Sequence, residues 1–283
     1  MIVRPRRSAL FMPASNTRAI EKARSLDCDV VILDLEDAVA PELKEAARSQ
    51  AVVAAAEGGF GRRELLVRVN ALDTPWGRDD CRAVVDAGFD AVVLPKVSHP
   101  ADLQAARALL GTVPLWAMIE TCAGMLDLPA IVGSARDNRL ECLLAGTNDL
   151  AKDMRCTPGA DRTPLLGHLA MIVTAARTAG LTALDGVCNV IEDGEVLAAE
   201  CAQGAAFGFD GKSLIHPAQI AAANRAYGPT ADVIAWAERI IAAFALPENA
   251  GKGAIRVDGA MVELLHLDQA RRIAALAGAI AGS

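Results

Sequence analysis

Short, continuous runs of apolar residues recur through this chain, and five of them end on charged side chains. The charged residues that follow these runs are Glu36 with Asp37, Arg68, Lys96, Glu120 and Asp149. In a parallel sheet that is covered on both faces, the strands are continuous Val, Ile and Leu stretches, and ligands bind beyond their carboxyl ends. We therefore expect five strands to bring charge to one site.

Between the apolar runs lie alanine-rich segments with helical spacing, and this alternation predicts βαβ units with a parallel sheet. The expected strands cover residues 9–13, 30–35, 65–70, 91–97, 115–119, 142–145, 183–187 and 206–209. The expected helices include residues 16–26, 41–56, 79–87, 100–110, 164–179 and 193–201. Eight such units favour an α/β fold of the closed (β/α)₈ TIM-barrel type, with an open doubly wound sheet as the alternative.

The pattern changes after Pro217. We expect an alanine-rich helix over residues 231–245, a strand pair joined by Asp258 and Gly259, and a last helix over residues 268–280, because Asp-Gly between two apolar runs is a hairpin signal. The predicted organisation is a catalytic barrel over residues 1–228 and a C-terminal helix and hairpin extension over residues 229–283. We expect this extension to cover a neighbouring subunit's active site.

Composition excludes several classes of protein. The net charge of −7 argues against nucleic-acid binding, because phosphate backbones attract clustered Lys and Arg. The 7 cysteines include no Cys-x-x-Cys pair, which is typical of reduced thiols in a cytosolic protein. Since no stretch approaches the ~18 apolar residues of a membrane span, we expect a cytoplasmic protein without a membrane partner.

Glu120 and Asp149 are candidate metal ligands, because both follow adjacent predicted strands at the same end of the sheet. Two carboxylates, completed by waters and substrate oxygens, are what Mg²⁺ or Mn²⁺ prefers. The alternative is that each carboxylate caps the following helix. Glu36 and Asp37 belong to a crowd of acids that needs a compensating cation, and we interpret them as groups that hold metal-bound waters. A helix-start cluster ahead of Pro41 is the other interpretation.

Arg68 is expected to point into the barrel mouth, where it would hold a substrate carboxylate or form a structural ion pair with Glu36 or Glu120. Lys96 and Lys212 also permit a Schiff-base aldolase, but such an enzyme does not need the carboxylate pair. His216 after the last strand can contact a ligand, although packed histidines are more common there. Glycines that allow a close approach of a phosphate are Gly204, Gly208 and Gly211.

Seven motifs together resemble the citrate lyase beta subunit-like family, within the HpcH/HpaI aldolase/citrate lyase superfamily, which includes malyl- and citramalyl-coenzyme A lyases. They are RSALFMP at 7–13, LDLEDAVAP at 33–41, VRVN at 67–70, LPKV at 94–97, IET at 119–121, NDL at 148–150 and GFDGKSLIHP at 208–217. The motifs run in order across nearly the whole chain, so the resemblance is specific.

The resemblance implies a (β/α)₈ barrel that forms a homotrimer or hexamer and binds Mg²⁺ and an acyl-coenzyme A. It assigns Glu120 and Asp149 as metal ligands and Arg68 as the catalytic group that meets the substrate carboxylate. Further residues implied to bind the substrate are Gly146, Thr147 and Asn148, and those implied to meet coenzyme A are Phe11, Arg18 and Lys22. Asn16 stands where some relatives have a basic residue.

The catalytic acid/base implied by the resemblance lies in the tail. Relatives commonly have Asp after Met-Ile or Met-Val, whereas this chain has Glu263 after Met261 and Val262. The added methylene matters, because a displacement of ~1 Å can cost a catalytic group ~10²-fold in rate. In the implied reaction, cleavage of the substrate yields a 2-oxo acid and an acetyl-coenzyme A enolate, which Glu263 of the adjacent subunit protonates.

Three functions are compatible with these residues. The first is a magnesium-dependent carbon-carbon lyase that acts on malyl-, citramalyl- or citryl-coenzyme A. The second is a malyl-coenzyme A-type thioesterase, which releases coenzyme A and leaves the acid skeleton intact. The third is the beta subunit of a multi-subunit citrate lyase that acts on a carrier-bound citryl group. Pull-down of carrier and transferase partners distinguishes the third function from the first two.

Overall fold

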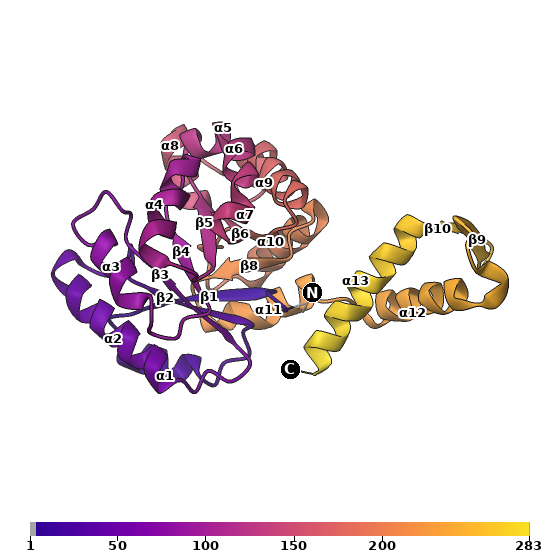
Figure 1. The fold of residues 1–283 in the computed structure, drawn as a ribbon, viewed down its shortest axis with the longest axis horizontal. Coiled ribbons are helices and arrows are strands. Elements are labelled where there is room, and N and C mark those ends of the chain that lie inside the picture. Colours follow the sequence, from indigo (N-terminus) through magenta and orange to yellow (C-terminus); the bar gives the residue numbers. More distant parts are fainter. Residues whose placement is uncertain (1–3, 283) are drawn as a thin grey trace. The chain divides into compact units, whose positions relative to one another are not determined.

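The computed structural model describes residues 4–282, which form two compact units (Figure 1). The larger unit spans Arg6–Tyr227. The smaller unit consists of residues 228–282 together with residues 4–5. Each unit has its own hydrophobic core, and we describe each in turn.

The larger unit is a closed barrel of eight parallel strands, which confirms the predicted (β/α)₈ fold. The strands pair in chain order, and β8 pairs with β1 to close the barrel. Their bounds are β1 Ser8–Pro13, β2 Val30–Asp34, β3 Glu64–Arg68, β4 Ala91–Leu94, β5 Leu115–Ile119, β6 Leu140–Ala145, β7 Thr182–Asp185 and β8 Gly211–Leu214. Nearly every strand residue is buried, as expected for strands covered on both faces.

Helices surround the barrel and connect consecutive strands (Figure 1). The α-helices are α1 Thr17–Ala23, α2 Lys44–Glu57, α3 Gly77–Val84, α4 Pro100–Leu110, α5 Cys122–Leu126, α6 Leu128–Gly133, α7 Ala135–Asn138, α8 Thr147–Met154, α9 Leu166–Thr178, α10 Gly194–Phe207 and α11 Ile220–Tyr227. Short 3-10 turns precede three of them, at η1 Pro41–Leu43, η2 Thr163–Leu165 and η3 Pro217–Gln219.

Alternate strand residues pack in two separate cores. One set faces the helices, and the other fills the barrel interior with a small cluster that includes Val30, Leu66, Trp116 and Leu184. Because side chains alternate along a strand, Arg68 points to the same interior side as Leu66. The middle of the interior is therefore apolar, with charge at both of its ends. Arg68 and its acids lie at the carboxyl-terminal mouth, and Arg6, paired with Glu64, lies over Trp116 at the other end.

The predicted eighth strand over residues 206–209 is wrong. Ala206 and Phe207 end helix α10, and Gly208 follows in the left-handed region at φ +94°. The strand starts instead at Gly211, with the sequence Gly-Lys-Ser-Leu. Its polar residues do not form an apolar run, so the sequence pattern favoured the apolar helix end in its place. Helices α5 to α8 and α11 were not predicted.

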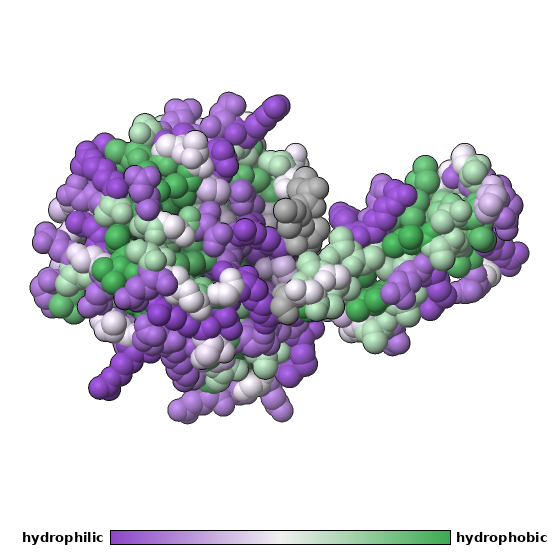
Figure 2. Space-filling view, turned by 60° about the horizontal axis from the view of Figure 1, so that its bottom comes forward, coloured by the Kyte–Doolittle hydropathy of each residue, from purple (hydrophilic) through white to green (hydrophobic). Residues whose placement is uncertain are grey.

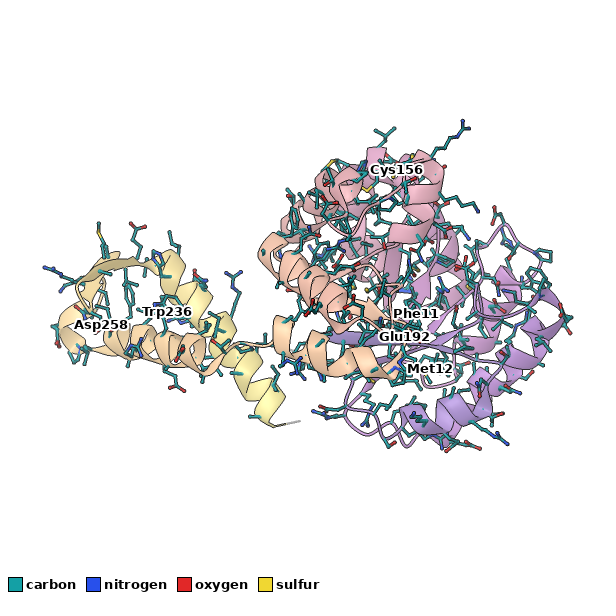
Figure 3. The ribbon with its side chains drawn as sticks, turned by 180° about the vertical axis from the view of Figure 1, so that it is seen from behind. Phe11, Met12, Cys156, Glu192, Trp236 and Asp258 are labelled. Carbon is teal, nitrogen blue, oxygen red and sulfur yellow. The ribbon has the colours of Figure 1, made fainter. Side chains whose placement is uncertain are left out.

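The smaller unit contains two helices and a two-stranded hairpin. Helix α12 spans Ala231–Ala245, η4 spans Pro247–Asn249, β9 spans Ala254–Val257, β10 spans Ala260–Glu263 and α13 spans Leu264–Ala281. The strands are antiparallel, and Asp258 and Gly259 form the turn at φ +51° and +84°. Figure 3 labels Asp258 at this turn and Trp236 on α12, whose ring packs against the unit's core. Helix α13 begins four residues earlier than predicted, directly after β10.

One side of the hairpin remains uncovered by its own unit. Val262 and Ile255 face the core, whereas Met261 is 73% exposed and Glu263 is exposed. Leu264 and Leu265 at the start of α13 are also exposed, and Figure 2 shows hydrophobic surface on this unit. Apolar side chains in such numbers around one carboxylate are typical of an interaction surface.

All 7 cysteines are free, which is consistent with the expected reduced thiols. Burial, the largest cause, raises the pKa of Cys28 and Cys201 to about 11, so these thiols are unreactive at neutral pH. In residues 4–282, every helix is too short or too polar to cross a membrane.

Candidate active site

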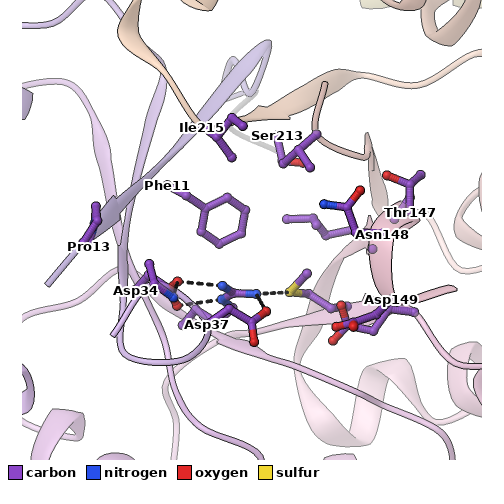
Figure 4. Close-up of a pocket in the computed structure, with 17 residues that line it drawn as sticks. Phe11, Pro13, Asp34, Asp37, Thr147, Asn148, Asp149, Ser213 and Ile215 are labelled. Carbon is purple, nitrogen blue, oxygen red and sulfur yellow. Dashed lines mark hydrogen bonds and ion pairs between the residues drawn. The ribbon is translucent and has the colours of Figure 1, made fainter. Parts of the chain in front are cut away.

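A cavity of about 320 Å³ opens at the carboxyl ends of the barrel strands (Figure 4). Ligands of (β/α)₈ enzymes bind at this end of the barrel. Its lining includes four of the charged residues singled out from the sequence, together with the predicted Phe11 and the segment 146–148. The full lining is Phe11, Pro13, Asp34, Asp37, Ala38, Arg68, Met118, Glu120, Leu144, Ala145, Gly146, Thr147, Asn148, Asp149, Val187, Ser213 and Ile215.

Arg68, at the end of β3, is held by carboxylates on one side of the cavity. Its Nε and Nη2 donate to Asp34 Oδ1 and Oδ2 at 2.7 and 2.6 Å, and Nη1 lies 2.8 Å from Glu36 Oε2. Burial alone would lower the pKa of Arg68, but the charges of Asp34, Glu36 and Asp37 raise it by more. The net effect is a pKa above the usual value, so the group is always cationic. The ring of Phe11 stands 4.8 Å from the guanidinium carbon. Asp34 thus occupies the Nε–Nη2 edge, and a ligand carboxylate must share Nη1 with Glu36 Oε2 and with Asp37 Oδ2, which lies 3.4 Å away.

Glu120 follows β5 directly and is only 2% exposed. Its Oε1 accepts the backbone N–H of Lys96 at 2.7 Å. Gly146 lies so close that a Cβ atom there would stand 2.3 Å from both Cβ and Oε2 of Glu120. Burial and the neighbouring charge of Glu36 raise the pKa of Glu120 to about 7. A buried acid of this kind is stabilised as a carboxylate only when a cation joins it.

Asp149 lies in the first turn of α8, immediately after β6. Strands β5 and β6 are neighbours, with Ile119 paired to Ala145, so Glu120 and Asp149 line the same cavity. The side chain of Asp149 is 30% exposed and approaches Lys96 Nζ at 4.0 Å. The structure thus brings together the two carboxylates that the sequence predicted as a pair.

The residues between the two carboxylates have different environments. Thr147 is buried beside Gly186, where a Cβ would lie 2.4 Å from Thr147 Oγ1. Asn148 is exposed, and its amide exchanges two hydrogen bonds with the amide of Asn189, at 3.2 and 2.8 Å. Both line the cavity with Gly146, so all three predicted substrate-binding residues lie where a ligand can reach them.

The donor set fits a divalent cation of the magnesium type. Two carboxylates lie at one edge of the cavity, and Glu36 Oε2 is a buried oxygen without a hydrogen bond, although Arg68 Nη1 is nearby. Among residues 4–282, no three His, Cys, Asp or Glu side chains gather closely enough to form a complete metal site. Such a pair can hold Mg²⁺ only if waters and substrate oxygens complete its shell, which is the usual arrangement for this ion.

Glu36 and Asp37 occupy a loop that other buried groups hold in place. Lys44 Nζ donates to the backbone oxygens of Leu35 and Glu36 at 2.8 and 2.7 Å and to Asn70 Oδ1 at 2.7 Å. The Glu36 side chain is buried and accepts from Lys96 Nζ at 2.7 Å, whereas the Asp37 side chain is 63% exposed. Burial, the largest cause, raises the pKa of Glu36 despite these cations.

The residues implied to meet coenzyme A are spread along β1 and α1. Phe11 lines the cavity and covers Arg68, and Figure 3 labels it on β1. Arg18 and Lys22 are exposed on α1, and neither lines the cavity. Asn16 caps α1, because its side chain accepts the N–H of Ala19 at 3.1 Å. Asn16 thus has a structural role that a basic residue could not fulfil.

Several other residues that the sequence singled out have structural roles. Lys212 is fully buried and bonds to Asp185 and Glu200 at 3.0 and 2.9 Å, outside the cavity lining, which argues against a Schiff base there. His216 Nδ1 accepts the N–H of Ala218 and caps η3. A Cβ at Gly204 would meet Tyr227 and Asp185, and one at Gly211 would meet the backbone of Arg6, so neither glycine faces a ligand.

Glu263 belongs to the smaller unit. It is exposed at the junction of β10 and α13, and its backbone N–H donates to His266 Nδ1 at 3.0 Å. Within that unit, the described residues form no ion pair with its carboxylate. Glu263 and His266 form a capping box at the start of α13, and the Glu263 side chain is exposed to solvent.

Asp34 belongs to the predicted crowd of acids at the end of β2, but two contacts of Arg68 that shape the site were not predicted. Asp34 is the main partner of Arg68, and the two residues are directly paired in the β2–β3 register. The sequence carried a signal for this contact. Asp34 and Arg68 both lie near the carboxyl ends of their predicted strands, and residues near the ends of adjacent parallel strands lie side by side. Met118 contributes its sulfur, 3.7 Å from Arg68 Nη1, and no sequence signal indicated it.

Comparison with known proteins shows that the chain belongs to the HpcH/HpaI aldolase/citrate lyase family, whose sequence profile matches residues 7–217. A (3S)-malyl-CoA thioesterase from Cereibacter sphaeroides is 47% identical and aligns over 98% of this chain and 96% of its own length. The mitochondrial citramalyl-CoA lyase of Homo sapiens is 32% identical over 98% of this chain and 86% of its own length. The crystal structure of protein CitE from Mycobacterium tuberculosis in complex with magnesium, acetoacetate and coenzyme A has a TM-score of 0.76 and 31% identity, covering 96% of this chain and 97% of that one. The family resemblance is confirmed.

Proposed function

We propose that this member of the HpcH/HpaI aldolase/citrate lyase family is a magnesium-dependent enzyme that hydrolyses a malyl-type coenzyme A thioester. The products are the free hydroxy diacid and coenzyme A. The observation that carries the proposal is a single cavity lined by a buried arginine, Arg68, and a carboxylate pair, Glu120 and Asp149. An arginine suits a substrate carboxylate, and the pair suits a divalent cation.

Hydrolysis is preferred over carbon-carbon cleavage for two reasons. The relative named as a thioesterase is 47% identical, whereas the one named as a lyase is 32% identical, and both align over 98% of this chain. In addition, the tail carboxylate is Glu263 where the lyases of the family commonly have aspartate. The glutamate side chain is one methylene longer than aspartate, so its carboxylate meets the substrate at a different point. This favours proton transfer at a different atom from the one that the lyases use.

The cation is expected to be held by Glu120 and Asp149. When bound, magnesium acts as a Lewis acid that polarises the substrate oxygens it contacts. The crystal structure of protein CitE, in which magnesium accompanies coenzyme A and acetoacetate, supports this choice of ion. Glu36 and Asp37 are proposed to orient the waters that surround the cation.

The residues of this chain then divide the remaining tasks. Arg68, fixed by Asp34, orients the distal carboxylate of the acyl group through Nη1, which that carboxylate shares with Glu36 and Asp37. Phe11 excludes water from one face of this ion pair. Phe11, Arg18 and Lys22 are proposed to contact the coenzyme A portion of the substrate. Arg18 and Lys22 are exposed cations on α1, and they attract the phosphates of coenzyme A.

Glu263 is proposed as the base. It removes a proton from the attacking water, whose oxygen forms the new bond to the thioester carbon, and the carbon–sulfur bond breaks to release the coenzyme A thiolate. The thiolate then takes up the proton. Met261, Leu264 and Leu265 leave exposed apolar surface around Glu263, so we propose that the tail of a neighbouring copy supplies Glu263 in a homotrimer or hexamer.

Carbon-carbon cleavage is the second candidate. It is favoured by the carboxylate that persists at position 263 and by the 32% identical citramalyl-CoA lyase. In that reaction Glu263 takes the proton of the substrate hydroxyl, the bond between the hydroxyl-bearing carbon and its neighbour breaks, and Glu263 returns the proton to the acetyl-coenzyme A enolate. The same cavity and cation serve both reactions.

Product analysis tests the proposal. Purified protein is incubated with (3S)-malyl-coenzyme A and magnesium in water enriched in ¹⁸O, and the products are separated by mass spectrometry. Hydrolysis gives coenzyme A and malate that carries one ¹⁸O atom, and chelation of the metal stops the reaction. Glyoxylate and acetyl-coenzyme A would instead establish the lyase reaction. If neither product pair forms from malyl-, citramalyl- or citryl-coenzyme A, the proposed function is wrong.

A further inference from the structure

Lys96 has a backbone conformation that lysine seldom adopts. Its φ is +55°, in the left-handed region, where a side chain with a Cβ costs roughly 1 to 2 kcal/mol. The strained residue follows β4 directly, and its N–H donates to Glu120 Oε1 at 2.7 Å. Strain that persists beside a functional site is evidence of a role in that site.

The Lys96 side chain reaches two more acids of the same cluster. Its Nζ donates to Glu36 Oε1 at 2.7 Å and stands 4.0 Å from Asp149 Oδ2. One residue therefore contacts Glu120 through its backbone and Glu36 and Asp149 through its ammonium group. It does not line the cavity, and its side chain is 43% exposed, so it has room to move away from the acids.

We propose that Lys96 is a positioning residue whose ammonium group balances the carboxylate cluster in the metal-free protein and thereby competes with the divalent cation. Its backbone N–H keeps Glu120 in place in both states, whereas its Nζ gives up its approach to Asp149 when the cation binds. This inference rests on the proposed metal site at Glu120 and Asp149.

Electrostatics fixes the direction of the effect. Arg68 already faces Asp34, Glu36 and Asp37, so Lys96 is the cation nearest to Asp149 among the described residues that form ion pairs. A positive charge beside a cation site weakens cation binding, and its loss leaves the acids uncompensated. Removal of the charge should therefore strengthen magnesium binding and destabilise the metal-free protein.

The opposite result is expected if Lys96 only supports the site. A lysine that merely holds Glu36 and Asp149 in a binding geometry would, once removed, leave a looser site with a lower affinity for magnesium. The sign of the affinity change therefore separates the two roles, and activity measurements are not needed to see it.

The test is calorimetric titration of the full-length protein with magnesium chloride, together with thermal unfolding in the metal-free and metal-bound states. Lys96→Gln and Lys96→Met should bind magnesium roughly two- to tenfold more tightly than wild type. Their metal-free melting temperatures should fall by about 1 to 4 °C, and the rise on adding magnesium should be larger than in wild type.

Two variants act as controls. Lys96→Arg keeps the charge and should bind magnesium as wild type does. Arg136→Gln removes one positive charge from an exposed position on α7, which leads into the start of β6 and so lies at the end of the barrel opposite the carboxylate cluster; it should change the affinity by less than about twofold.

Unchanged or weaker magnesium binding by both Lys96→Gln and Lys96→Met would overturn the inference while leaving the proposed function in place. Wild-type protein that binds no magnesium would overturn the metal site itself, and the inference with it. Tighter binding by Arg136→Gln of the same size as that by Lys96→Gln would also overturn it, because the effect would then be one of overall charge.

Discussion

At the scale of single residues, the site depends on close contacts that allow little substitution. Gly146 and Glu120 belong to neighbouring strand ends, and the space for a side chain at position 146 is already filled by Glu120. Arg68 is likewise fixed by two hydrogen bonds to Asp34. Such fixed positions are what a site needs in order to hold a cation and a substrate acid in one geometry.

The first prediction concerns Gly146→Ala. The new Cβ would stand 2.3 Å from Glu120 Cβ, so rotation of the glutamate cannot relieve the contact. We expect magnesium affinity to fall at least about tenfold and the free energy of unfolding to fall by about 1 to 3 kcal/mol. Gly133→Ala in α6 is the control, because nothing lies within 4 Å of the added Cβ. Wild-type magnesium affinity in Gly146→Ala would contradict the assigned role of Glu120.

The second prediction follows from the pKa of Glu120, which burial raises from 4.5 to about 7. A raised acid pKa contributes stability that is complete below the unfolded pKa and is lost as the pH rises through the folded one. Relative to wild type, metal-free Glu120→Gln should therefore gain about 2 to 3 kcal/mol of unfolding free energy between pH 5 and pH 8. Urea unfolding with a chelator measures this difference. A difference that does not change with pH would show that Glu120 is not a buried, titrating acid.

At the scale of elements, the sequence predicted seven of the eight strands and the end of the barrel at which charge gathers. Continuous apolar runs identify buried parallel strands, and parallel order places their carboxyl ends together. The partner of Arg68 could also have been found, because Asp34 and Arg68 follow from the β2–β3 register. Strand β8 could not have been found from the sequence pattern. Its Lys212 and Ser213 are polar, and they are buried only because they bond to partners distant in sequence.

Those partners form an ion network between β7, β8 and α10. Lys212 bonds to Asp185 and Glu200, and Arg162 Nη1 bonds to Asp185 at 2.8 Å. Asp185 and Lys212 are fully buried, so no water can replace a lost partner. The network fixes the β7–β8 end of the barrel without touching the cavity.

The third prediction tests this network. Lys212→Met leaves two buried carboxylates with Arg162 alone, and we expect the free energy of unfolding to fall by about 3 to 5 kcal/mol. Magnesium affinity should stay within about twofold of wild type, because Lys212 does not line the cavity. Arg82→Met, which breaks an exposed ion pair on α3, should cost less than about 1 kcal/mol. A large loss of magnesium affinity in Lys212→Met would mean that Lys212 belongs to the site.

At the scale of the whole molecule, the barrel contains the candidate site and the tail carries an exposed carboxylate. The sequence predicted helix α12 and the hairpin, because an alanine-rich helix and an Asp-Gly turn are local signals. It could not predict which copy of the barrel Glu263 serves, since that depends on assembly. The exposed Met261, Leu264 and Leu265 around Glu263 are consistent with a tail that docks on another copy.

The fourth prediction concerns this assembly. Glu263→Gln and Arg68→Lys should each lower turnover at least about 10²-fold, the first without loss of stability, because Glu263 is exposed. If the tail acts on a neighbouring barrel, subunits of the two variants that are mixed and reassembled should recover up to roughly a quarter of wild-type activity. Mixtures that stay as inactive as the separate variants would show that each tail serves its own barrel.

We propose above all that Glu120 and Asp149 hold a divalent cation beside Nη1 of Arg68. A crystal of the protein soaked with magnesium and malate tests it most directly. We expect one ion in contact with a carboxylate oxygen of Glu120 and of Asp149, with a malate carboxylate hydrogen-bonded to Arg68. An ion bound elsewhere, or malate bound away from Arg68, would contradict it.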